Sequence, residues 1–168
     1  MFHVLIDTCV WLDLAENPKQ TPLLDPLIAM LSGGYMDLLV PRTVQDEFKA
    51  NRARVAKTSE KSLSTHFNLV KDAIRKAGGD KRTKDKVLGY LSDVDHRIPL
   101  IGGTAAGTLD RIAVLLDVAT PIETDDVVKV RAADRALHRK APCHQNKNSM
   151  ADAVLIETYF ECVRNGKP

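Results

Sequence analysis

The stretch Phe2-His-Val-Leu-Ile-Asp7-Thr8 decides the fold class of this chain. Its apolar run is short, partly β-branched and not alternating, which predicts a strand buried on both faces in a parallel sheet. Asp7 follows at the carboxyl end of that strand, where open parallel α/β sheets carry their ligand sites. The stretch therefore predicts an α/β fold and marks a candidate site at one end of its sheet.

The remaining chain alternates predicted helices with short strands. Gly and Pro residues, apolar spacing and capping patterns divide it. The expected order is a helix over Leu23–Leu31, a strand over Leu38–Val40, a helix over Thr43–Ala77, a helix around Val87–Val94, a loop over Arg97–Gly107, a helix over Leu109–Val118, a short strand ending at Thr120–Thr124, and helices over Val127–Leu137 and Ala153–Val163. Capping boxes are expected at Thr43, Thr124 and Ser149. This alternation favours a parallel sheet with helices on its faces.

Length and composition exclude several classes of protein. A chain of 168 residues with 44% hydrophobic and 27% charged residues is expected to form a single globular domain over residues 1–168. Its longest apolar runs are too short for a membrane span, and Asp7 interrupts the first run, which excludes a secretory signal. The three cysteines form no C-x-x-C pair. We therefore expect a cytoplasmic protein with neither a disulfide framework nor a structural zinc site.

Charge is distributed unevenly along the chain. Residues 42–86 contain 13 Lys and Arg against 6 Asp and Glu, a net charge of +7, whereas the whole chain carries +2. A basic segment in an otherwise acidic chain is typical of a surface that faces a polyanion, although a solvated helical face gives the same pattern.

Three carboxylates stand where the predicted elements can bring them together, namely Asp7, Glu47 and Asp152. Carboxylates in a partly dry cleft raise each other's pKa unless a cation neutralises them. Ligands that offer only oxygen select Mg²⁺ or Mn²⁺, which commonly act on phosphate. A purely structural role is the alternative for two of them, because Glu47 follows Thr43 and Asp152 follows Ser149 at the start of a predicted helix.

Three ordered segments carry a resemblance to a known family. They are His3-Val-Leu-Ile-Asp7-Thr8, Leu39-Val-Pro-Arg-Thr-Val-Gln-Asp-Glu47-Phe48 and Lys147-Asn-Ser-Met-Ala-Asp152-Ala-Val-Leu-Ile156. In order and spacing they resemble the motifs of PIN-domain nucleases, and the third is most similar to the stand-alone bacterial PIN-like group. The resemblance implies a PIN-like three-layer α/β fold with a parallel sheet flanked by helices. It also implies a metal-dependent endoribonuclease that hydrolyses RNA.

The resemblance assigns roles to individual residues. It makes Asp7, Glu47 and Asp152 the catalytic ligands of Mg²⁺ or Mn²⁺. Thr8 and Asn148 become supporting polar groups, and Lys147 is expected to position phosphate. Lys49 and Arg52, at the start of the basic segment, are expected to hold the RNA backbone.

The chain departs from the family pattern at its end. PIN domains usually continue past the helix of the third acid into a strand that carries a further acid, whereas this sequence ends at Lys167-Pro168. We therefore expect the domain to lack the last strands, and we expect a longer chain, a homodimer or another protein partner to cover that edge. The departure also supports an alternative function, a degenerate PIN module that binds RNA or a protein partner without cleavage.

Overall fold

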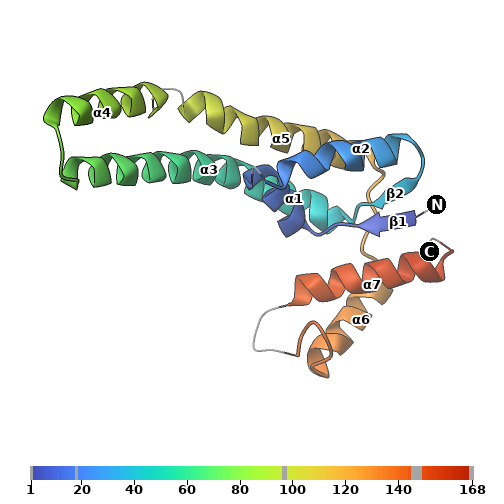
Figure 1. Ribbon diagram of the computed structural model, residues 1–168. Coiled ribbons are helices and arrows are strands. Elements are labelled where there is room, and N and C mark those ends of the chain that lie inside the picture. The colour runs from blue at the N-terminus through green and yellow to red at the C-terminus, as the bar shows by residue number, and fades with distance from the viewer. Residues whose placement is uncertain (1, 18, 96–97, 145–148, 167–168) are drawn as a thin grey trace.

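The computed structural model describes residues 2–17, 19–95, 98–144 and 149–166. Within these ranges the chain folds into β1 (Phe2–Leu5), α1 (Thr8–Glu16), the 3₁₀ turn η1 (Thr21–Leu23), α2 (Leu24–Ser32), β2 (Met36–Leu39), α3 (Arg42–Lys76), α4 (Lys81–Asp95), α5 (Ile98–Val118), α6 (Asp126–Leu137) and α7 (Met150–Arg164). The structure is mostly helical around a small parallel sheet, which confirms the predicted α/β fold class (Figure 1).

The sheet contains β1 and β2 in parallel register, with Phe2 opposite Met36 and Leu5 opposite Leu39. The strand expected near Thr120–Thr124 is present only as one bridge, in which the Ile122 amide donates to the Val40 carbonyl at 2.8 Å. In the described part of the chain, β1 pairs with β2 alone. One edge of β1 is therefore without a neighbouring strand.

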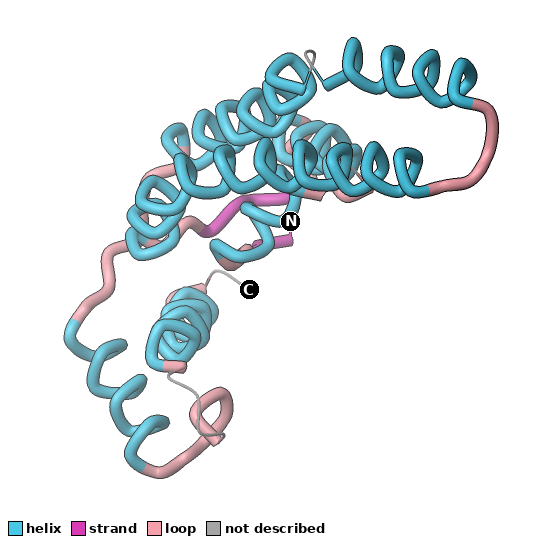
Figure 2. The backbone as a smooth tube through the Cα atoms, turned by 90° about the vertical axis from the view of Figure 1, so that its left-hand side faces the viewer, coloured by secondary structure: helices cyan, strands magenta, loops and turns pink. Residues whose placement is uncertain are grey.

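Helices lie on both sides of this sheet (Figure 2). On one side α1, α3 and α5 pack together around the fully buried side chains of Trp11, Phe48 and Ile112. On the other side α6 and α7 pack against each other below β1 (Figure 1). This arrangement places the end of β1 between the start of α3 and the start of α7.

The long helix α3 confirms the expectation of one uninterrupted helix after β2. Its 35 residues correspond to about 52 Å at ~1.5 Å per residue. Its second half and α4 form an arm that extends away from the sheet (Figure 1). No helix among the described residues is long and apolar enough to cross a membrane.

Several local predictions were wrong. The prediction of a loop over Arg97–Gly107 is wrong for its described residues, because α5 begins at Ile98. Pro99 lies in the first turn of this helix, where proline is tolerated. Burial of Ala105 in the interior offsets the weak helix propensity of the nearby glycines. Helix α1 had not been predicted at all.

The expected capping boxes are also wrong, at Thr43, Thr124 and Ser149. Helix α3 begins after Pro41 without a side-chain cap, so Thr43 lies inside its first turn. In α6 the cap is Asp125, which accepts from the Val128 amide at 2.7 Å, rather than Thr124. The N-cap lies one residue later than expected, and the Asp125 carboxylate satisfies the otherwise unpaired amide of the third helical residue.

Candidate active site

Asp7 is held in place by the start of the helix that follows it. One carboxylate oxygen accepts from the Thr8 amide at 2.7 Å, and the other accepts from the Cys9 thiol at 2.8 Å. Asp7 is thus the N-cap of α1, where the helix dipole favours negative charge. The turn from β1 into α1 therefore orients a carboxyl group at the end of the sheet.

Glu47 is tied to the same turn through Thr8. The Thr8 hydroxyl donates to a Glu47 carboxylate oxygen at 3.0 Å, and Thr8 itself is buried. If the Glu47 carboxylate only stabilised the start of α3, it would need no contact with Thr8, which lies 39 positions earlier in the chain. Thr8 therefore links the first two acids, by its backbone to Asp7 and by its side chain to Glu47.

Asp152 lies in the first turn of α7, half-buried. Ser149 makes no side-chain capping hydrogen bond, so the capping box considered for this pair is not formed. In the described ranges, no hydrogen bond or ion pair joins the Asp152 side chain to another residue. Its carboxylate is free to face the space between α7 and β1.

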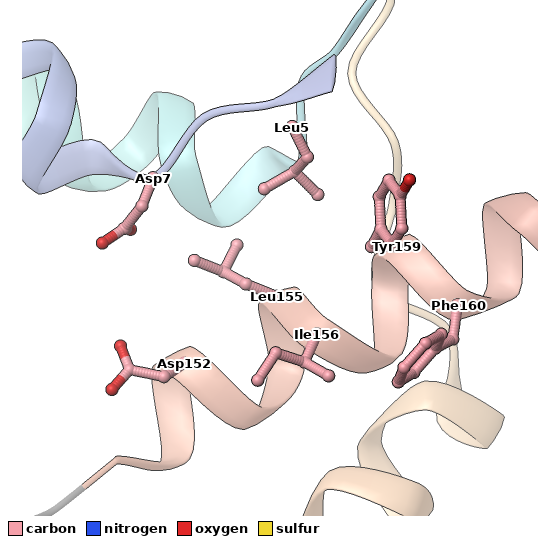
Figure 3. Close-up of a pocket in the computed structure, with 7 residues that line it drawn as sticks. All are labelled: Leu5, Asp7, Asp152, Leu155, Ile156, Tyr159 and Phe160. Carbon is pink, nitrogen blue, oxygen red and sulfur yellow. The ribbon is translucent and has the colours of Figure 1, made fainter. Parts of the chain in front are cut away.

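A cavity of about 590 Å³ separates β1 from α7. Its lining consists of Leu5, Asp7, Asp152, Leu155, Ile156, Tyr159 and Phe160. Figure 3 shows the two carboxylates at one end, the two aromatic rings at the other and the aliphatic side chains between them. The volume is in the usual range for small-molecule sites, and two carboxylates from opposite walls share it.

The three expected acids do not form a closed metal site. In the parts of the chain that the structure describes, no three His, Cys, Asp or Glu side chains come together as a group that could hold a metal ion. Mg²⁺, however, usually keeps several waters and takes only one or two protein carboxylates together with substrate phosphates. The pair of Asp7 and Asp152 fits an open site of that kind, whereas Glu47 is hydrogen-bonded to Thr8 but is not among the residues that line the cavity.

The other predicted site residues have different surroundings. Lys49 forms an ion pair with Asp117 at 3.0 Å and Arg52 forms one with Asp110, so both join α3 to α5. Lys147 and Asn148 lie outside the described residues.

Sequence reasoning missed two polar residues next to Glu47. The Asn51 side-chain amide donates to the Glu47 carbonyl at 2.9 Å, and the Arg54 guanidinium donates to the Asn51 side-chain oxygen at 2.9 Å. Helical spacing was the signal that could have found them, because residues 47, 51 and 54 are separated by four and three positions. Cys9, two residues after Asp7, was likewise overlooked as a partner of its carboxylate.

The thiol of Cys9 reports on the charge of Asp7. Its hydrogen bond to Asp7, partial burial and the negative charges of Asp7 and Asp13 raise the pKa of Cys9 from 9.0 to about 11. Because a higher pKa leaves less thiolate at pH 8, we expect slow alkylation in EDTA. In a Cys143→Ser background, Asp7→Asn should accelerate alkylation about tenfold, after allowance for the weaker nucleophile. An unchanged rate would show that Asp7 does not control this thiol.

A family model described as PIN domain matches residues 4–168. No curated protein and no solved structure matches the chain. The matched range includes Asp7, Glu47 and Asp152.

Proposed function

The chain belongs to the PIN-domain family, generally a nuclease module, and from this premise we propose that it is a metal-dependent endoribonuclease that hydrolyses RNA phosphodiester bonds. The observation that carries the proposal is the cavity between β1 and α7, because Asp7 and Asp152 reach it from opposite walls. Acids on separate elements that meet in one partly apolar cavity are typical of a catalytic site. The single domain proposed for this activity comprises residues 1–168.

In this proposal Asp7 and Asp152 hold Mg²⁺ or Mn²⁺, and Glu47 completes the acidic site through Thr8. The cation would supply the positive charge that polarises a phosphoryl oxygen and activates water for in-line attack. The chain's own contribution is to fix the two carboxylates. The Thr8 amide orients Asp7, and α7 presents an Asp152 carboxylate that has no competing side-chain partner among the described residues. The aliphatic side chains of the lining lower the dielectric constant beside the carboxylates, which strengthens electrostatic contacts there.

A second candidate function has one observation in its favour. Because the described residues contain no closed group of three metal ligands, a degenerate PIN module that binds RNA or a protein without cutting it also fits the site. The two functions differ in whether the acids bind a divalent cation. That binding is measurable without any substrate.

Mn²⁺ is therefore expected to stabilise the wild-type protein against heat. At a Mn²⁺ concentration about 100 times its Kd, ligand linkage gives about 2.7 kcal/mol, or roughly 5–10 °C in Tm for a chain of this size. Asp152→Asn should abolish the shift, whereas Asp85→Asn on the exposed surface of α4 should retain it. Differential scanning calorimetry measures the change in Tm. Equal changes in all three proteins would show that Asp152 does not bind the metal.

We also propose that the free edge of β1 is a contact surface for a second copy of the chain or another protein. A sheet edge that has no neighbouring strand among the described residues favours association through a further strand. Sedimentation equilibrium of the purified chain distinguishes a homodimer from a monomer that awaits a different partner.

A further inference from the structure

One face of α3 continues directly from Glu47 toward the tip of the arm. Side chains separated by three or four residues share a helical face. Counting from Glu47, that spacing selects Asn51, Arg54, Lys57 and Lys61. We call this face the α3 track. Its cations lie on one side of the helix, and the buried residues of α3 lie on a different side.

The α3 track is exposed and positively charged. Arg54, Lys57 and Lys61 are all exposed. Arg54 is hydrogen-bonded to Asn51, and among the described residues neither lysine has a carboxylate partner. Lys49 and Arg52 differ from them because they project toward α5 and are neutralised there. Among the described residues of α3 up to Lys61, the cations without a carboxylate partner are therefore those of the track.

Hydrogen bonds connect the track to the candidate active site. The chain of contacts leads from Thr8 to the carboxylate of Glu47, from the Glu47 carbonyl to Asn51, and from Asn51 to Arg54. Along the helix, Glu47 and Lys61 are 14 residues apart, which is about 21 Å. This is the length of about six stacked nucleotides at ~3.4 Å each.

We propose that the α3 track binds the backbone of a single-stranded RNA whose neighbouring phosphate lies at the acidic site. This inference rests on the proposed nuclease function and extends it, because it names the residues that select long single strands. A single row of cations can contact the phosphates of one strand along its length, whereas a duplex presents the phosphate backbones of two strands. RNA is favoured over an acidic polypeptide because the row starts at a site built for phosphate chemistry.

The test measures binding apart from cleavage. Fluorescence anisotropy in EDTA compares labelled single strands of about 4 and about 20 nucleotides. The variant is Lys57→Ser/Lys61→Ser, and the matched control is Lys19→Ser/Lys129→Ser, which removes the same charge from exposed positions elsewhere. For the long RNA we expect the variant to lower the salt slope by about 1.4 and to weaken binding about tenfold at 0.2 M salt, whereas the control has no effect.

For the short RNA, neither protein should show measurable binding at 0.2 M salt, because the strand is too short to contact the whole track and the acidic site without a cation does not hold its phosphates. If the variant binds the long RNA as tightly as the wild type does, the proposed binding of RNA by the α3 track is contradicted, even if the protein cleaves RNA. Polyglutamate of equal charge that binds as tightly as the long RNA would also overturn it. If the variant shows the lower salt slope and the weaker binding but the wild type cleaves no RNA with Mn²⁺, RNA binding by the α3 track is supported and the proposed nuclease function is contradicted.

Discussion

Asp7→Asn is expected to reduce RNA cleavage about a thousandfold, which corresponds to about 4 kcal/mol of lost transition-state stabilisation. The substitution removes the charge that would hold the cation. Its side-chain oxygen can still accept from the Thr8 amide, because Asn caps helices as well as Asp does. Loss of activity in a folded protein would therefore be a chemical effect. Cleavage is measured as the single-turnover rate with Mn²⁺.

Asp13→Asn is the matched control, since Asp13 lies on the exposed face of the same helix α1. It should leave the rate within a factor of about two, in line with the small effect of ordinary surface substitutions. If Asp7→Asn retains more than a tenth of wild-type activity with an unchanged Tm, Asp7 is not part of the catalytic site.

Arg135→Leu is expected to destabilise the protein by about 3 kcal/mol. Arg135 of α6 pairs with Glu157 of α7, whose side chain is only 6% exposed. Removal of the cation leaves a buried carboxylate without its main partner, which typically costs ~3–5 kcal/mol. Arg164, 4.0 Å from the same carboxylate, compensates in part. Urea denaturation measures the loss, and cleavage should fall as well because α7 carries Asp152.

Two further variants isolate the cause. Arg131→Leu breaks a neighbouring pair whose acid, Glu161, is 25% exposed, so a loss of about 1 kcal/mol or less is expected. The double variant Arg135→Leu/Glu157→Leu should recover most of the stability, because a buried ion pair can often be replaced by apolar side chains. A double variant as unstable as the sum of its single variants would contradict the buried-charge explanation.

Sequence patterns predicted the elements that are set by local physics. The run before Asp7 became β1, and the uninterrupted helix after β2 extends over Arg42–Lys76 as expected. Helix α5 was mispredicted because Gly102, Gly103 and Gly107 have low intrinsic helix propensity, which tertiary packing of its later residues overrides. Helix α1 was missed because its apolar face depends on Trp11 and on contacts with α3 and α5 that sequence spacing does not reveal.

The candidate site could be located from sequence, but its internal contacts could not. The position of Asp7 at a strand end predicted the region. The cavity that Asp7 shares with Asp152 depends on how α7 lies against β1, which is a tertiary feature. Lys49 and Arg52 were chosen by charge alone. Their ion pairs with α5 show that the helical face, counted from Glu47, is the better guide to cations that stay available.

The most direct test of the proposed function is the chemistry of the RNA ends. Purified wild-type protein is incubated with mixed single-stranded RNA in Mn²⁺ or in EDTA, and the products are assayed for 2′,3′-cyclic phosphate. Because attack by water does not use the 2′-hydroxyl of RNA, we predict cleavage in Mn²⁺ that leaves no cyclic phosphate, and none in EDTA. No cleavage in Mn²⁺, or cleavage in EDTA that leaves cyclic phosphate, would contradict a metal-dependent nuclease.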